Sequence, residues 1–278
     1  MAVDDIGYRR FAPPPGAHEL VDHLWVVRYP AGAVSHEVVL PDGHGLVVVA
    51  VGTPGVHVDP LTQRRTPDAS GVRGLATRAT VREQRGPAAR VGAQLDPLAL
   101  ARLGVARPVT DRLDPVETLL SPEVATACAV ALEAGQDEDA AHLLGGGLAA
   151  RFRPEQEDPT LALLEPVVRE VLESDGLVRS SDVARNAGLA VGTLHRWVVE
   201  HLGVAPDVFL AAVRFSAFVR DAVGPGPVRP EDVLGAIRWY VQAAYPPREV
   251  ERFTGNSLLE LRRLERGIAE ALGTAVGG

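Results

Sequence analysis

The chain has 278 residues, 46% of them hydrophobic, and a formal net charge of −8. This length predicts two domains, and this composition can fill two apolar cores. All 28 basic residues are arginine, which excludes phosphate-binding loops, Schiff-base sites and kinase sites that require lysine. The single cysteine, Cys128, excludes an intrachain disulfide and a zinc site built from several cysteines.

The chain is expected to be cytoplasmic and to have no contact with a membrane. Its first residues are acidic and lack an apolar segment, so no signal peptide is predicted. The longest strongly apolar run, residues 46–51, is far shorter than the ~20 residues that cross a bilayer. Residues 161–278 hold 13 arginines against 15 acidic side chains. Binding to nucleic acid would therefore depend on where the arginines lie, and not on bulk charge.

Residues 1–110 are expected to form a β-rich sensor domain. Strands are predicted at residues 24–29, 37–40, 45–51 and 90–95, which are rich in β-branched and aromatic side chains. Glycine and proline interrupt them at residues 41–43 and 53–55. Short strands at this spacing indicate a sandwich or a barrel-like fold.

Residues 111–155 are interpreted as a helical connector and linker. One helix is predicted to open at Asp96-Pro97 and another at Ser121-Pro122, since Asp or Ser before proline is typical of a helix N-terminus. The glycines at 145–147 and the charged residues 151–158 predict a linker. From residue 161 onward the pattern is helical.

A weak internal repeat organises the C-terminal part of the chain. One segment runs from residue 181 to Gly203 and the other from residue 231 to Gly255. An arginine, Arg196 or Arg248, precedes each closing glycine by seven residues. A repeated supersecondary unit within residues 156–278 is therefore predicted.

The first repeat has the layout of a helix-turn-helix. A short helix that contains the small Ala184 precedes Gly188, at a point where a tight turn favours positive φ. A second helix is predicted over residues 191–202, with Leu194, Trp197, Val198 and Leu202 on one face. Short helix, glycine turn and second helix are typical of this motif. A long helix over residues 206–223 is expected to join the two units rigidly.

These residues resemble the two helix-turn-helix units of AraC/XylS transcriptional regulators. In the first unit and the joining helix the matching residues are Val183-Ala184, Gly188-Leu189, Thr193 to Arg196, Gly203 to Pro206 and Val213 to Phe215. In the second unit they are Tyr240, Ala244, Arg248 to Val250 and Arg252 to Gly255. The match covers residues 161–268. The N-terminal part, with residues 40–43 before an apolar strand, is similar to an uncharacterised domain found ahead of such pairs.

The second unit departs from the family pattern. Trp239 stands where the family has a turn glycine, and Tyr245 stands where it has a histidine. Pro246 and Pro247 replace an aromatic-aliphatic pair and are expected to shorten the reading helix. In the first unit Ala190 replaces a serine that would cap the helix. We expect the second unit to contribute less to recognition than the first.

The resemblance implies that DNA is contacted from the second helix of each unit. The candidate residues are Ala190, Val191, Gly192, Thr193, His195, Arg196, Ala244, Tyr245, Arg248 and Arg252. For His195 and Arg196 the competing interpretation is a solvated helix residue. For Arg248 it is a local ion pair with Glu249 or Glu251. Trp197 and Trp239 are interpreted as core residues.

No catalytic residue, cofactor or metal is expected. His36, His44 and His57 lie near predicted strands, but no dense metal-ligand motif is present. The sequence has no G-x-S-x-G nucleophile elbow and no G-x-G-x-x-G after a strand. An enzyme in the β-rich part is the least favoured alternative.

The sequence thus predicts an α+β protein with an N-terminal β-rich sandwich or barrel-like domain. An all-α domain with two helix-turn-helix units on a linker helix follows it. The predicted function is that of a sequence-specific transcriptional regulator. Its expected partners are double-stranded DNA, a small-molecule effector and a second copy of the chain. The alternative is a degenerate module that senses a ligand or pairs with a partner but binds DNA poorly.

Overall fold

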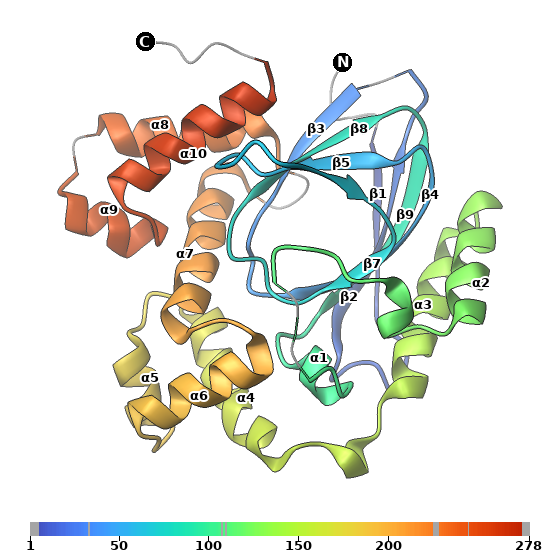
Figure 1. The fold of residues 1–278 in the computed structure, drawn as a ribbon, viewed down its shortest axis with the longest axis horizontal. Helices are drawn as coiled ribbons and strands as arrows, with labels where there is room; N and C mark the ends of the chain where they lie inside the picture. Colours follow the sequence, from blue (N-terminus) through green and yellow to red (C-terminus); the bar gives the residue numbers. More distant parts are fainter. Residues whose placement is uncertain are drawn as a thin grey trace.

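The computed structural model describes residues 6–32, 34–106, 108, 110–224, 228–243 and 245–273. Two antiparallel sheets form the N-terminal part, and helices follow on both sides of them (Figure 1). The predicted α+β class, with a β-rich sandwich ahead of a helical region, is confirmed.

Within the described residues, nine strands build the two sheets. They are β1 (Gly7–Phe11), β2 (Val21–Tyr29), β3 (Val34–Val39), β4 (Gly45–Gly52), β5 (Gly55–Val58), β6 (Arg65–Asp68), β7 (Gly71–Arg73), β8 (Thr80–Arg85) and β9 (Ala88–Leu95). The five-stranded sheet has the order β1-β2-β9-β4-β7, and the four-stranded sheet the order β3-β8-β5-β6. The four predicted strands correspond to β2, β3, β4 and β9, while the others were not predicted.

Alternation along the strands separates the two faces of the five-stranded sheet. On β2, Leu24 and Val26 are buried in an apolar cluster with residues of α2 (Pro122–Glu133) and α3 (Asp137–Arg151). Trp25 and Tyr29 lie on the opposite face, toward the four-stranded sheet. Helices therefore cover one face, and the second sheet covers the other (Figure 1).

The segment interpreted as a connector contains these two sheet-packing helices. Ser121 caps α2 as predicted, since its side chain accepts a hydrogen bond from the backbone of Val124. The interpretation of residues 145–147 as a linker is wrong, because all three glycines lie inside α3. A Cβ at Gly145 would lie 2.5 Å from Pro14, so this glycine allows α3 to approach the N-terminal segment closely.

The remaining helices follow the predicted course. They are α1 (Ala99–Arg102), α4 (Pro159–Glu173), α5 (Ser180–Asn186), α6 (Val191–Leu202), α7 (Pro206–Val223), α8 (Pro230–Gln242), α9 (Pro247–Thr254) and α10 (Leu258–Ala271), with short 3₁₀ turns at Val116–Thr118 and Pro154–Gln156. The bounds of α6 and α7 are those predicted. The helix predicted to begin at Asp96-Pro97 starts at Ala99, and the Asp96 carboxylate accepts from the backbone of Leu98.

Strands and C-terminal helices share apolar cores. Val38, Val58 and Val81, on the outer face of the four-stranded sheet, pack in one cluster with residues of α7, α8 and α10. Leu75 and Leu98 join a second cluster with residues of α4, α5, α6 and α7. The backbone of Val38 also donates to the carbonyl of Val228 at 2.8 Å. The two predicted domains are therefore in direct contact.

A test of length and hydropathy over the described residues finds no single helix that could span a membrane. One pair, Val191–Leu202 with Pro206–Val223, passes the test together but is bent by 65°.

A network of buried charges fills one end of the space between the sheets. The carboxylate of Asp68 contacts Arg90 at 2.8 Å, Arg82 at 2.9 Å and His57 at 3.2 Å. Arg82 also contacts Glu37 at 2.8 Å. Burial alone would raise the pKa of Asp68, but the neighbouring cations, above all Arg82, hold it well below its usual range. The ionised Asp68 balances two arginines that are themselves buried.

We expect Asp68→Asn to lower the free energy of unfolding by about 3–5 kcal/mol, because it leaves a buried arginine without its counter-ion. Because the folded pKa is depressed, the contribution of Asp68 is present above its unfolded pKa of about 4 and is lost as pH falls below that value. Urea denaturation at neutral pH and near pH 3 measures both effects.

The matched control is Asp182→Asn, which breaks an exposed pair with Arg185 and should cost less than about 1 kcal/mol. Equal losses in the two variants would contradict a structural role for the buried network.

Candidate nucleic-acid interface and sensor cavity

The first helix-turn-helix is formed by α5 and α6. Gly188 lies in the turn between them with φ +67°, as the predicted tight turn requires. Leu194, Val198 and Leu202 of α6 are buried, and Trp197 packs beside them, partly buried. The predicted inner face of α6, including the core role of Trp197, is confirmed.

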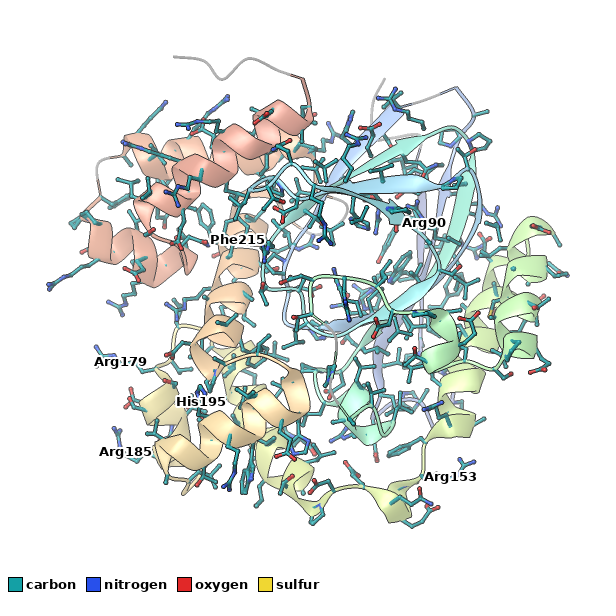
Figure 2. The ribbon with its side chains drawn as sticks, viewed as in Figure 1. Arg90, Arg153, Arg179, Arg185, His195 and Phe215 are labelled. Carbon is teal, nitrogen blue, oxygen red and sulfur yellow. The ribbon has the colours of Figure 1, made fainter. Side chains whose placement is uncertain are left out.

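The opposite face of α6 is open to solvent. Val191, Gly192, His195 and Arg196 are exposed, and Thr193 is half-buried. Ala190 precedes the helix and provides no side-chain cap. Arg196 forms no ion pair with another described residue, so its guanidinium has its donors available. Figure 2 places His195 on this helix, in the same region as Arg179 and Arg185 of the first unit.

The closing glycines of the repeat end both second helices in the same way. Gly203 follows α6 with φ +75°, and Gly255 follows α9 with φ +69°. A Cβ at Gly255 would lie 2.4 Å from the carbonyl oxygen of Ala211 on α7. Gly255 is therefore required both by its left-handed backbone and by close packing on the joining helix.

The second unit is formed by α8 and α9, and it corrects two predictions about Trp239. This residue lies inside α8 and not in the turn, and its side chain is 58% exposed and not in the core. The buried face of α8 is made by Val233, Ala236 and Ile237. Trp239 follows Ile237 by two positions, about 200° around the helix, and therefore points away from that face.

The reading helix of the second unit is short, as the prolines predicted. It begins at Pro247 and has 8 residues, whereas α6 has 12. Arg248 lies in its first turn, whereas Arg196 lies in the middle of α6. Tyr245 and Arg252 are exposed. Ala244 lies outside the described residues.

The two exposed helix faces differ in their charged side chains. On α9, Arg248 and Arg252 alternate with the exposed Glu249 and Glu251, so its net contribution is near zero. Neither arginine forms an ion pair with another described residue, so the local pair considered for Arg248 is not formed. The face of α6 presents Arg196 and His195 together and carries one exposed carboxylate, Glu200. The two faces therefore differ in the number of acidic side chains, one on α6 and two on α9, more than in net charge.

A cavity of about 690 Å³ lies between the sheets, and Glu37 and Arg82 of the buried charge network also line it. Trp25, Leu46 and Tyr8 contribute apolar and aromatic walls, and Arg73 lines it from β7. Arg220, in the last turn of α7, and Val228 line the same cavity. The C-terminal region thus contributes directly to the wall of the sensor cavity.

Arg73 is an unusual group in this cavity. Burial lowers the pKa of its guanidinium, and its Nε has no hydrogen-bond partner. No carboxylate of a described residue lies within ion-pair distance of it. A guanidinium nevertheless stays protonated in proteins, so a positive charge is held here, and Asp42 and Asp111 stabilise it from beyond ion-pair distance. No sequence pattern indicates this role, since a lone arginine in a short strand is typical of a surface position.

The three histidines near strands do not converge. His36 faces Glu83 at 3.9 Å, His44 contacts the carbonyl of Leu95 at 3.1 Å, and His57 contacts Asp68. Within the described residues, no group of three or more His, Cys, Asp or Glu is placed to hold a metal ion. Cys128 is buried, which raises the pKa of its thiol to about 11 and disfavours the reactive thiolate.

Comparison with known proteins gives distant likenesses only. No protein-family model matches the chain, and no curated protein is significantly similar in sequence. The structure is similar to ToxT from Vibrio cholerae O395 (9% identity, 94% of this chain and 98% of that chain covered, TM-score 0.38). It is also similar to fatty-acid-bound ToxT from strain SCE256 (9%, 92% and 96%, TM-score 0.40) and to the AraC-like transcriptional activator CuxR (13%, 94% and 91%, TM-score 0.31).

These TM-scores lie below 0.5, so the likenesses carry no functional argument by themselves. The family resemblance found in the sequence is matched by the chain's own architecture. A β-rich sandwich precedes two helix-turn-helix units, and a linker helix joins those units.

Proposed function

We propose that the chain is a sequence-specific DNA-binding transcriptional regulator. Two helix-turn-helix units on one linker helix carry the proposal, each with an exposed arginine seven residues before a left-handed closing glycine. In this motif the second helix enters the major groove. Arg196 and His195 on α6 are suited to guanine edges and phosphates. Arg248 and Arg252 on α9 provide the corresponding contacts of the second unit.

We expect Arg196→Ala to weaken binding to a selected DNA site by about 1–3 kcal/mol, and Arg248→Ala by at least about 1 kcal/mol less. The reason is that α6 is longer than α9 and carries one exposed carboxylate, Glu200, where α9 carries two. Fluorescence anisotropy with the full-length protein at several salt concentrations measures both, and about 3–5 phosphate contacts predict a log–log salt slope near −3 to −4.

Arg169→Ala is the control, because Arg169 pairs with Glu165 on α4 outside both units. Equal losses for Arg196→Ala and Arg248→Ala would show that the second unit reads DNA as well as the first. Absence of salt-dependent binding would favour the alternative, a degenerate module that binds DNA poorly. The zero net charge on the exposed face of α9 is consistent with that alternative.

The effector of this regulator is proposed to be a small organic anion in the cavity between the sheets. The unpaired charge of Arg73 would hold the anionic group, and Trp25 and Leu46 would contact its apolar part. Arg220 and Val228 line the same cavity, so a bound ligand would contact the C-terminal end of α7. This helix joins the two helix-turn-helix units.

Replacing Arg73 by methionine separates binding from stability. We expect Arg73→Met to stabilise the free protein by about 1–3 kcal/mol, because an unpaired buried charge is costly. The same variant should lose the rise in melting temperature that 4-phenylbutyrate gives the wild type, whereas uncharged 4-phenylbutanamide should give neither protein a rise. Arg112→Met, at an exposed position, is the control. A destabilised Arg73→Met protein that still responds to the carboxylate would contradict the proposal.

Pairing of two copies is proposed to use the outer face of α2 and α3. A shallow groove between these helices exposes Val130 and Leu143. Gly146 lies on the same face, in the middle of α3, and a Cβ there would meet nothing within 4 Å. Glycine inside a helix costs about 1 kcal/mol relative to alanine, so packing within one chain does not explain it. Close approach of a helix from a second copy of the chain would explain a glycine at this position.

If this face pairs two chains, Leu143→Arg should raise the dimer dissociation constant at least 10-fold. Burying an arginine in an apolar contact without a partner is strongly unfavourable. Sedimentation equilibrium measures the constant, and Leu61→Arg, at a similarly exposed leucine between β5 and β6, should leave it unchanged. A wild-type protein that stays monomeric at high concentration rules out this pairing.

A further inference from the structure

A patch of aromatic side chains lies open on the second helix-turn-helix. Trp239 is 58% exposed, and Tyr245 and Phe253 are each 41% exposed. The ring of Trp239 lies 5.1 Å from that of Tyr240 and 5.9 Å from that of Tyr245. Neither DNA reading nor core packing accounts for a tryptophan this exposed, since it points away from the buried face of α8. Large exposed aromatic groups usually mark a contact with a ligand or partner.

A pocket of about 370 Å³ opens beside these rings. Phe218 and Ala236 belong to its apolar lining, and the rings of Trp239, Tyr240 and Phe253 form part of its wall. Its lining residues come from α7, α8, α9 and the segment between α4 and α5. The pocket therefore touches the second helix-turn-helix, the helix that joins the two units and the segment that leads into the first unit.

The charged groups of this pocket favour a cation. Asp175 and Asp221 line it, both are exposed, and neither forms an ion pair with another described residue. Arg214 is the one basic side chain among the lining residues, and its guanidinium donates to the backbone carbonyl of Arg252 at 3.5 Å. Arg214 also lines the neighbouring groove that contains Arg248 and Arg252. Two free carboxylates thus face one arginine that contacts α9.

We propose that this pocket binds a small organic cation that carries an aromatic or other flat apolar group. The faces of Trp239 and Tyr240 would attract the positive charge, since aromatic rings are negative on their faces. The guanidinium of Arg252 already lies over the ring of Phe253, 5.5 Å from its centroid, so this ring serves as apolar wall. Asp175 and Asp221 would supply the opposite charge, and the apolar lining would take the uncharged part of the ligand. A site of this size holds a molecule of roughly 10–20 non-hydrogen atoms, at the small end of known ligand pockets.

A ligand bound in this pocket would also affect how the two helix-turn-helix units are positioned relative to each other. A ligand in contact with Leu177 on one side and with Trp239 on the other would favour one arrangement of these units. Only this consequence rests on the proposed DNA-binding function, because the binding site itself does not require it. Binding and its effect on DNA affinity are therefore measured separately.

The first experiment titrates the full-length protein with benzyltrimethylammonium and follows tryptophan fluorescence and heat of binding. We expect saturable binding, with at least 10-fold weaker binding of uncharged N-benzylacetamide. Trp239→Leu should abolish both signals. Trp197→Phe, which alters a tryptophan outside this pocket, should bind as the wild type does.

The role of the carboxylates is tested with Asp175→Asn, Asp221→Asn and the double variant. Because both positions are exposed, these variants are expected to fold, and circular dichroism checks that they do. The double variant should bind the cation at least 10-fold more weakly than the wild type does. Its affinity for N-benzylacetamide should be unchanged. Equal affinity of the wild type for the cation and the uncharged probe, or undiminished binding by Trp239→Leu, would overturn the proposal.

The final arm measures DNA affinity with and without saturating benzyltrimethylammonium. A change in affinity that Trp239→Leu abolishes supports coupling between the pocket and the two units. Saturable cation binding in a protein that binds no DNA would leave the pocket established and refute the regulator function. DNA binding without any cation binding would refute the pocket alone.

Discussion

The burial of α7 is the constraint on which the rest of the structure depends. Phe209, Leu210 and Val213 in its first half lie in the apolar cluster of α4, α5 and α6. Phe215 and Phe218 in its second half lie in the cluster of α8, α10 and the four-stranded sheet. One helix thus belongs to both helix-turn-helix units and also packs on strands. Its buried side chains leave little freedom for either unit to move alone.

One turn of the N-terminal region packs especially closely against this helix. A Cβ at Gly43, in the turn predicted at residues 41–43, would lie 2.7 Å from Val213 and 3.1 Å from Phe209. The turn therefore serves both to reverse the chain between β3 and β4 and to admit α7. Arg220, at the far end of α7, reaches the sensor cavity. A ligand there and a helix-turn-helix are separated by one rigid element, which is a physical route for coupling between them.

How far the sequence predicts this structure depends on how local each signal is. The bounds of α6 and α7 follow from amphipathic spacing and from proline and glycine at their ends, so they were predicted correctly. Strands β5 to β8 are short, and their ion pairs form between residues distant in sequence, such as Arg90 with Asp68. No local pattern reports such a pairing. The glycines at 145–147 were misinterpreted because close packing of α3 on the sheet, and not flexibility, explains Gly145.

The candidate sites also divide into features with a local sequence signal and features that depend on long-range contacts. The exposed face of α6 was predictable, because one helix carries all its residues. Trp239 was misplaced because the family pattern was applied to a unit whose turn begins later, after Gln242. Arg73 could not be identified, since its lack of an ion-pair partner is a property of the folded cavity.

The second unit would be needed for the stability of the fold even without residues that contact DNA, because α8 and the following α10 cover the four-stranded sheet. Without α8 and α10, the outer face of the four-stranded sheet would expose Val38, Val58 and Val81, which are now almost fully buried. Burying each such side chain contributes roughly 1.5–3 kcal/mol. The constraint on α8 therefore lies on its buried face, through Val233 and Ile237. Its outward face, which carries Trp239, is free to acquire a different partner. An exposed tryptophan is expected on a helix whose buried face must still pack against the sheet but whose outward face is no longer needed to contact DNA.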